Sequence, residues 1–183
     1  MSRAIDFNRI SEEELPQAKR IAEYFKTHLK SWDVVIDVGC GPGIYVHAIN
    51  EARDTGRCYG VDNNEQMPSH LDLNKVDVTG ISTWPASVVL SLEVGEHISM
   101  NDADAYISFI RRTGAHTVYF SAAAPGQGGE GHINCQPKVY WCEKFFRAGF
   151  YYDPDERNHW LKFMSEGYHM GWLMQNGMVF RRG

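Results

Sequence analysis

The sequence lacks any apolar run that approaches the roughly 20 residues of a membrane-spanning helix. Residues 1–6 also lack the basic-then-apolar pattern of a secretory signal. Four cysteines are present, but no two of them form a C-x-x-C pair, which argues against a zinc ribbon and a thioredoxin-type motif. We therefore expect a cytoplasmic protein that has no membrane partner and whose thiols are reduced and packed.

Positive charge is also scarce. The chain has 18 Lys and Arg against 23 Asp and Glu, so its formal net charge is -5. Affinity for a phosphate backbone needs many basic contacts, which disfavours nucleic acid as a partner without excluding it. A small-molecule or glycan acceptor fits this composition better. The oligomeric state is not predicted by the sequence.

Helical and β-branched segments alternate along the chain. Helical spacing predicts helices over residues 12–30, 44–52, 99–113, 139–148 and 156–168, with a short one near 65–71, and Ser11 with Glu14 has the spacing of a capping box at the first helix. Strands are predicted at 32–38, 57–61, 87–92, 116–121, 150–152 and 177–181, with a weaker one that ends near Asp77. Such alternation predicts an α/β fold with a mostly parallel sheet and helices on both faces, a doubly wound arrangement.

A glycine-rich segment, Asp37-Val-Gly-Cys-Gly-Pro-Gly43, joins the first predicted strand to a helix. Glycines at such a junction permit tight backbone angles and close approach of a ligand. Asp62 follows at the end of the second strand, where a carboxylate can accept hydrogen bonds from the ribose of an adenosine. The pattern predicts an adenosine-containing ligand, and the alternative is a sharp turn beside a solvated Asp62. The spacing G-x-G-x-G departs from the dinucleotide motif G-x-G-x-x-G, which disfavours a nicotinamide-dependent oxidoreductase.

Four short segments follow one another along the chain, at residues 34–43, 59–62, 76–79 and 88–93. In their order and spacing they resemble the motifs of class I S-adenosylmethionine-dependent methyltransferases. The resemblance implies S-adenosylmethionine as cofactor and a Rossmann-like, seven-stranded sheet that ends in a C-terminal antiparallel hairpin. It also implies that Asp37 and the glycine loop hold the methionine part, that Asp62 holds the ribose and that Asp77 binds the adenine amino group. The full cofactor set is Asp37, Gly39, Gly41, Gly43, Asp62, Asp77 and Leu92.

A cluster of acids and imidazoles is expected at the same edge of the sheet. Glu93, Glu96 and His97 are spaced so that they would share one face of a helical turn, and His132 lies in a glycine-rich loop over residues 122–134. These four side chains suit a divalent metal such as Mg²⁺, Mn²⁺, Fe²⁺ or Zn²⁺. The alternative assigns Glu93 to the cofactor, Glu96 to solvent and His97 to a helix cap.

The E-x-x-E-H pattern is similar to that of metal-dependent O-methyltransferases of ubiquinone biosynthesis and of enzymes that methylate small-RNA 3′ ends. The similarity implies that the acceptor is one hydroxyl of an adjacent pair. Methyl transfer needs an acceptor in line with the sulfonium and a group that removes the proton, so His97, His132 and Glu93 are the candidate catalytic residues.

The sequence therefore predicts a single methyltransferase domain over residues 1–183. Residues 1–31 form its N-terminal helix, 32–121 its cofactor-binding core and 122–183 the loop, helices and strands on the acceptor side. The favoured reaction is O-methylation of a small molecule or glycan, with metal assistance on a vicinal diol or catechol. RNA ribose methylation, N-methylation and a catalytically inactive cofactor-binding module are the alternatives.

Overall fold

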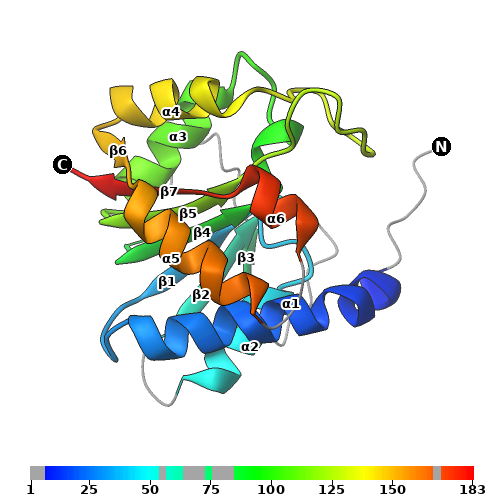
Figure 1. Cartoon of the computed structure of the whole chain (residues 1–183), viewed down its shortest axis with the longest axis vertical. Helices are drawn as coiled ribbons and strands as arrows, with labels where there is room; N and C mark the ends of the chain where they lie inside the picture. The colour runs from blue at the N-terminus through cyan, green and yellow to red at the C-terminus, as the bar shows by residue number, and fades with distance from the viewer. Residues whose placement is uncertain (1–6, 54–56, 64–72, 76–84, 167–169) are drawn as a thin grey trace.

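The computed structural model describes residues 7–53, 57–63, 73–75, 85–166 and 170–183. Its strands form one sheet in the order β3-β2-β1-β4-β5-β7-β6 (Figure 1). Their bounds are Val35–Val38 (β1), Cys58–Asp62 (β2), Leu73–Lys75 (β3), Val88–Leu92 (β4), Thr117–Ser121 (β5), Phe150–Tyr152 (β6) and Met178–Arg182 (β7). Strands β1 to β5 pair in parallel, whereas β7 runs antiparallel to both β5 and β6.

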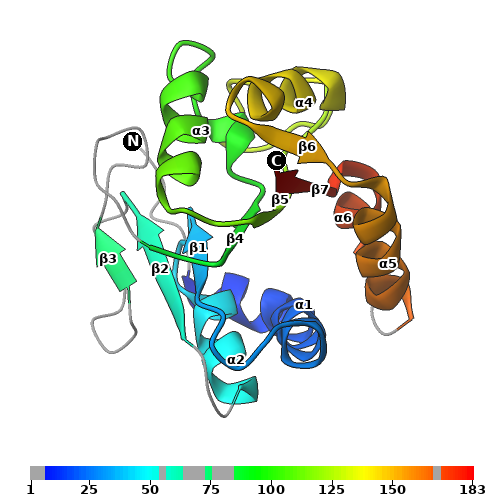
Figure 2. The same cartoon turned by 90° about the vertical axis from the view of Figure 1, so that its left-hand side faces the viewer.

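The central strands are apolar because both faces of the sheet are covered. All residues of β1, β4 and β5 are buried, as expected for parallel strands between two helical layers. The helices are α1 (Phe7–His28), α2 (Ile44–Ala52), α3 (Ala103–Arg112), α4 (Lys138–Arg147), α5 (Pro154–Ser165) and α6 (Gly171–Asn176), with a 3-10 turn η1 at Gly95–His97. Helices α1, α2 and α5 lie on one face, and α3 and α4 lie on the other (Figure 2). The predicted doubly wound α/β class is confirmed.

Sheet topology positions the candidate site. The sheet reverses its order at β1, which has β2 on one side and β4 on the other. In open α/β sheets ligands bind outside the carboxyl ends of the strands at such a switch point. The glycine loop, Asp62, the segment from Glu93 to His97 and the loop over 122–134 all follow carboxyl ends of neighbouring strands, and the last of these extends past the sheet in Figure 1.

Several sequence predictions are corrected. Helix α1 begins at Phe7, so Ser11 lies within it and the predicted capping box at Ser11 and Glu14 is wrong. The predicted C-terminal hairpin is a pair of antiparallel strands with α5 and α6 between them, because the chain crosses a face of the sheet before it returns. The predicted helix near 65–71 and Asp77 lie outside the described residues.

The four cysteines are free, in agreement with the prediction of reduced thiols. Within the described ranges, no helix combines the length and the apolarity needed to cross a bilayer.

Candidate functional site

The glycine loop packs directly against the segment that follows β4. Gly39 has a φ of 80°, and a Cβ atom at this position would collide with the side chain of Val94. The backbone N–H groups of Gly39 and Cys40 both donate to the carbonyl of Val61, at 2.8 and 3.2 Å. Gly43, with a φ of 83°, is the N-cap of α2. Because L side chains rarely adopt this conformation, glycine at Gly39 and Gly43 allows the loop to turn sharply into the helix.

Asp62 connects the end of β2 to this loop. Its Oδ2 atom accepts a hydrogen bond of 2.8 Å from the backbone N–H of Gly41. Asp62 also lines a cavity of about 240 Å³, whose walls are Gly39, Asp62, Asn63, Glu93, Val94, His97 and Ile98. The structure therefore places Asp62, the residue predicted to bind the ribose, and two of the predicted catalytic residues, Glu93 and His97, on the walls of one cavity.

Asp37, a predicted cofactor residue in β1, is more deeply buried than Asp62. It is 2% exposed, and its Oδ2 atom has no hydrogen-bond partner in the described part of the chain. Burial, followed by the nearby charges of Asp62 and Glu14, raises the pKa of the Asp37 carboxyl well above its usual range. A buried carboxyl with an unpartnered oxygen is costly unless a ligand supplies a partner.

Leu92 is also buried, at 8% exposure, and packs in the core with α1 and α2. It does not belong to the lining of the 240 Å³ cavity. The role of Leu92 in cofactor binding remains a prediction, as does that of Asp77.

Three of the four predicted metal ligands lie together. One possible ligand atom from each of Glu96, His97 and His132 falls within 4.8 Å of the others. Glu96 is fully buried, and neither of its carboxylate oxygens accepts a well-formed hydrogen bond from a described residue. Burial raises the pKa of Glu96, an effect that the nearby backbone amides of Glu96 and Ala123 and the His132 ring partly offset. A bound cation would therefore stabilise the ionised form of the Glu96 carboxylate.

The two imidazoles are oriented by the backbone of the glycine-rich loop. The Nδ1 atom of His97 lies 3.1 Å from the carbonyl oxygen of Gly131, and Nδ1 of His132 lies 3.3 Å from that of Gln127. A carbonyl only accepts hydrogen bonds, so each Nδ1 carries a proton, and in the neutral form of either ring Nε2 would present a lone pair. The Nε2 atom of His132 is 3.9 Å from Oε1 of Glu96. A histidine that binds a metal through one ring nitrogen generally donates a hydrogen bond from the other, as Nδ1 of His97 and of His132 does here to a backbone carbonyl.

Electrostatics keep His97 in that neutral form. Burial lowers its pKa, and the neighbouring His132 lowers it further. The two rings meet edge to face with their centroids 4.9 Å apart.

Glycines in the loop allow this packing. A Cβ atom on Gly129 would overlap the ring of His132, and Gly131 has a φ of 76° where its carbonyl meets His97. The end of the loop is fixed because the backbone N–H groups of Ile133 and Asn134 both donate to the carbonyl of Glu96, each at 2.9 Å. The loop is therefore a scaffold that holds His132 against Glu96.

Glu93 does not belong to this group of three. It has a φ of 54°, the one positive φ of a non-glycine residue in the described chain, and it precedes the turn η1. The predicted helical turn that would place Glu93, Glu96 and His97 on one face is therefore wrong, because Glu93 adopts a left-handed conformation. Burial and the charge of Glu96 raise the pKa of Glu93 to about 7.

Sequence reasoning missed Asn176 and Gln127. The Nδ2 atom of Asn176 donates to Oε1 of Gln127 at 2.9 Å and contacts Oε1 of Glu93 at 3.4 Å. Oε1 of Gln127 also accepts from the backbone N–H of Ala124 at 2.6 Å. Asn176 lies in α6, far along the chain from Glu93, so no local sequence pattern could identify it.

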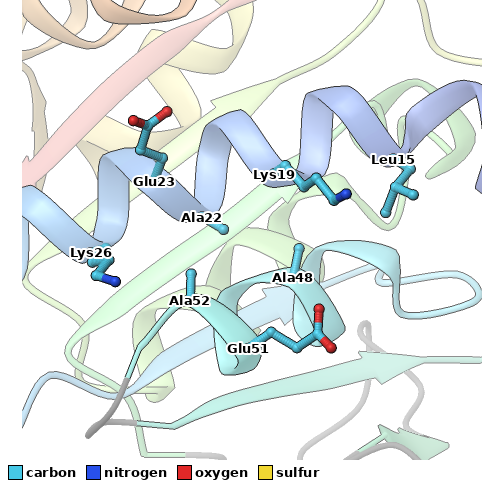
Figure 3. A pocket seen from close by; sticks show the side chains of 8 residues that line it. All are labelled: Leu15, Lys19, Ala22, Glu23, Lys26, Ala48, Glu51 and Ala52. Carbon is cyan, nitrogen blue, oxygen red and sulfur yellow. The ribbon is translucent and has the colours of Figure 1, made fainter.

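Two further cavities lie away from these residues. A groove of about 310 Å³ runs between α1 and α2, where Ala22, Ala48 and Ala52 form an apolar floor between charged side chains (Figure 3). Another cavity, of about 370 Å³, is lined by residues that include Trp32 and His116. Neither is lined by a predicted site residue.

Sequence comparison leaves the chain unassigned, because no family model and no curated protein matches it. Solved structures do match it over its whole length. A magnesium protoporphyrin IX methyltransferase from Synechocystis PCC 6803 with bound SAH has a TM-score of 0.68 at 13% identity, and the match covers 100% of this chain and 90% of that one. A SAM-dependent methyltransferase from Archaeoglobus fulgidus has a TM-score of 0.67 at 14% identity, with 97% and 100% covered. The sugar N-methyltransferase KedS8 from Streptoalloteichus sp. has 0.67 at 11% identity, with 100% and 94% covered.

The chain thus has a Rossmann-like α/β fold with a mixed sheet. More particularly, this fold is that of the class I S-adenosylmethionine-dependent methyltransferases, in agreement with the resemblance of its motifs.

Proposed function

We propose that the protein is an S-adenosylmethionine-dependent methyltransferase that methylates an oxygen atom with the help of a divalent metal. One observation carries the proposal: His97 belongs both to the Glu96, His97 and His132 cluster and to the wall of the cavity that Asp62 lines. A cofactor held at Asp62 and a metal held at His97 would be neighbours. Reaction centre and cofactor site would therefore meet in one cavity.

The donor set fits a borderline divalent ion. One carboxylate and two neutral imidazoles suit Mn²⁺, Fe²⁺ or Zn²⁺ better than Mg²⁺, which prefers oxygen ligands. The unsatisfied oxygens of Glu96 and the free Nε2 lone pair of each ring support the fit. Three protein ligands leave coordination positions open for oxygens of an acceptor. Bound there, the ion would lower the pKa of an acceptor hydroxyl.

The protein residues would divide the remaining work. Asp62 and the glycine loop would hold the adenosine, and Asp37 would face the methionine part. The sulfonium is a good leaving group, so the chain has to align the acceptor oxygen with the methyl carbon and accept a proton. Glu93, whose pKa is near 7 and which lines the cavity, is suited to accept that proton.

A small molecule or glycan with a vicinal diol or catechol fits these features best. Two adjacent oxygens would fill neighbouring open positions on one ion. The cavity lining, within the described residues, has no Lys or Arg, which disfavours a phosphate-rich acceptor such as RNA. A sugar amine is the second candidate acceptor, because the similar fold of KedS8 belongs to a sugar N-methyltransferase.

The test is calorimetric titration of the purified protein with S-adenosylhomocysteine, with NAD⁺ as the control ligand. Micromolar binding of S-adenosylhomocysteine alone supports the methyltransferase. Binding of neither ligand contradicts it. A parallel titration of EDTA-treated protein with Mn²⁺ tests the metal site. If Mn²⁺ does not bind, metal assistance is refuted and the proposal of methyl transfer stands alone.

A further inference from the structure

A group of arginine and aromatic side chains lies at the amino ends of the parallel strands. Helices α3 and α4 end there, and so does β7, because Arg181 of β7 pairs with Thr117 at the start of β5. The candidate cofactor cavity follows the carboxyl ends of the strands. Accordingly, the C-terminus and the loop over 122–134 lie on opposite sides of the molecule in Figure 1. We call this group the arginine patch, and its members are Arg111, Phe146, Arg147, Tyr151 and Arg182.

Contacts between three elements make the patch one surface. The Nη2 atom of Arg182 in β7 donates to the carbonyl of Arg111 in α3 at 2.6 Å. The rings of Phe146 in α4 and Tyr151 in β6 meet edge to face, with their centroids 5.6 Å apart. A Cβ atom on Gly183, the residue after Arg182, would touch the Tyr151 ring, so the basic and aromatic parts adjoin.

The guanidinium groups of the patch have no acidic partner. Arg111, Arg147 and Arg182 are exposed, and none of them forms an ion pair with a carboxylate in the described ranges, although the chain has 23 acids to 18 Lys and Arg. Arg111 and Arg182 each donate to a backbone carbonyl, that of Ala148 in the case of Arg111. A carbonyl fixes the side chain without neutralising it and leaves the other N–H donors of the guanidinium for a ligand. Such groups suit the oxygens of a phosphate.

The macrodipole of the helices explains only part of this arrangement. Positive charge is favourable at a helix C-terminus, which accounts for Arg111 and Arg147 at the ends of α3 and α4. It does not account for Arg182, which ends a strand. Nor does it account for the aromatic part, since Phe146 is 62% exposed and Tyr151 is 55% exposed. Exposed rings beside uncompensated guanidinium groups indicate a ligand that has both anionic and flat apolar parts.

We propose that the arginine patch binds single-stranded nucleic acid. The phosphates contact Arg111, Arg147 and Arg182, and unpaired bases stack on Phe146 and Tyr151, a combination that is typical of sites that bind single strands without sequence preference. An acidic peptide would use the guanidinium groups and leave the rings unused. A second copy of the chain, related by a two-fold axis through the patch, would bring like charges together.

The position of the patch limits what the bound strand does. The patch and the candidate cofactor cavity lie at opposite ends of the strands, so the nucleic acid is a docking partner and not the methyl acceptor. The net charge of -5 repels a polyanion and keeps the affinity modest. The inference does not rest on the proposed function.

The test is fluorescence anisotropy of a labelled ten-nucleotide oligothymidylate titrated with the purified protein at several salt concentrations. We expect a dissociation constant of about 10 to 100 μM at about 50 mM salt, within the usual range of non-specific binding. The logarithm of the association constant should fall against that of the salt concentration with a slope of about -2, because three neutralised phosphates contribute about 0.7 each.

Two single variants test the two parts of the patch. Arg147→Gln should reduce the slope by about 0.7, the contribution of one phosphate. The Arg147 side chain makes no polar contact with a described residue, so the variant leaves the fold intact. Phe146→Ala should weaken binding about fivefold or more, the value of one stacked base, and leave the slope unchanged. Lys162→Gln is the control, because it removes one exposed charge from α5 on the other face of the sheet and should bind like the wild type.

Three results would overturn the inference. The first is the lack of saturable binding of the oligothymidylate by the wild-type protein, which does not depend on the folding of any variant. The second is wild-type affinity and slope in both Arg147→Gln and Phe146→Ala. The third is equal or tighter binding of a ten-residue polyglutamate or of phosphatidylserine vesicles, which would assign the patch to an acidic protein or to a membrane surface. Failure to bind S-adenosylhomocysteine would contradict the proposed function and leave this inference unaffected.

Discussion

The Nε2 atom of His132 lies 3.9 Å from Oε1 of Glu96, although the two residues belong to loops that follow different strands. Glu96 follows β4, and His132 follows β5, the parallel neighbour of β4. The two loops are joined by the backbone bonds of Ile133 and Asn134 to the carbonyl of Glu96. The residue pair is thus held by main-chain contacts, and its geometry is sensitive to the backbone of the glycine-rich loop.

Gly129→Ala should weaken metal binding without removing any ligand. The added Cβ atom would overlap the His132 ring and displace it from Glu96. We expect Mn²⁺ affinity to fall about 10- to 100-fold, the range observed when the support of a metal ligand is lost. S-adenosylhomocysteine binding should stay unchanged. Calorimetric titration with each ligand measures both effects.

Gly128→Ala is the control, because a Cβ atom on Gly128 has no neighbour within 4 Å. If both alanine variants bind Mn²⁺ like the wild type, His132 is not a ligand in the proposed geometry.

Asp62→Ala and His97→Ala should separate cofactor binding from metal binding. Asp62 binds the glycine loop through Gly41, so its loss removes both the proposed ribose contact and a support of the loop. We expect S-adenosylhomocysteine affinity to fall about tenfold or more in Asp62→Ala, the value of one or two hydrogen bonds to a charged group. His97→Ala should keep that affinity and lose Mn²⁺. Calorimetric titration of both variants with S-adenosylhomocysteine and with Mn²⁺ measures these affinities. Equal loss of S-adenosylhomocysteine affinity in the two variants would refute this division of roles.

The fold and half of the site followed from local sequence patterns. The β-branched runs at Val35–Val38 and Val88–Leu92 were predictable because central parallel strands are buried on both faces. Gly39 and Asp62 were predictable because they lie where the first two strands end, at the edge of the sheet where a ligand binds. The positions of Glu93 and Asn176 were not. A left-handed φ at Glu93 depends on its tertiary surroundings, and the contact between Asn176 and Glu93 forms only when α6 packs beside the site.

Helix α1 provides the same contrast. The helical spacing that predicts it is carried by apolar residues that include Ala18, Ile21 and Phe25, and these are buried. Its start was misplaced, because the favourable capping spacing at Ser11 is a weak local preference that tertiary context overrides.

The stability of the metal-free protein should fall as the pH rises from about 4.5 to about 7. The pKa of Glu93 is raised from 4.5 to about 7, so over this range the folded state keeps a proton that the unfolded state releases. Raising the pH therefore favours unfolding, and above about 7 the full cost applies, with an upper bound of about 3 kcal/mol from this shift. Urea denaturation in EDTA at about pH 5 and about pH 8 measures the difference.

Glu93→Gln should flatten that dependence. Asp37 and Glu96 also have raised pKa values and contribute in the same direction, so the comparison of wild type with Glu93→Gln measures the contribution of Glu93 together with its effect on neighbouring Glu96. Identical slopes for the two proteins would show that Glu93 titrates normally.

Asn176→Ala should destabilise the protein and loosen the acidic side of the site. Asn176 is 1% exposed, and its Nδ2 atom bridges Gln127 and Glu93. Removal of the Asn176 amide takes one hydrogen-bond donor from Oε1 of Gln127. It also removes the hydrogen bond from Asn176 that lowers the pKa of Glu93. We expect the free energy of unfolding to fall by about 1 to 3 kcal/mol, as for other broken buried hydrogen bonds, and the pKa of Glu93 to rise.

Urea denaturation of Asn176→Ala measures the loss of stability, and its pH dependence reports on Glu93. Asn158→Ala is the control, because Asn158 is exposed. Within the described part of the chain, its side chain accepts a hydrogen bond from neighbouring Arg157. The pH range over which stability falls should extend upward in Asn176→Ala and stay in place in Asn158→Ala. A loss of stability in Asn176→Ala without that extension would mean that Asn176 supports the packing of α6 and leaves Glu93 unaffected.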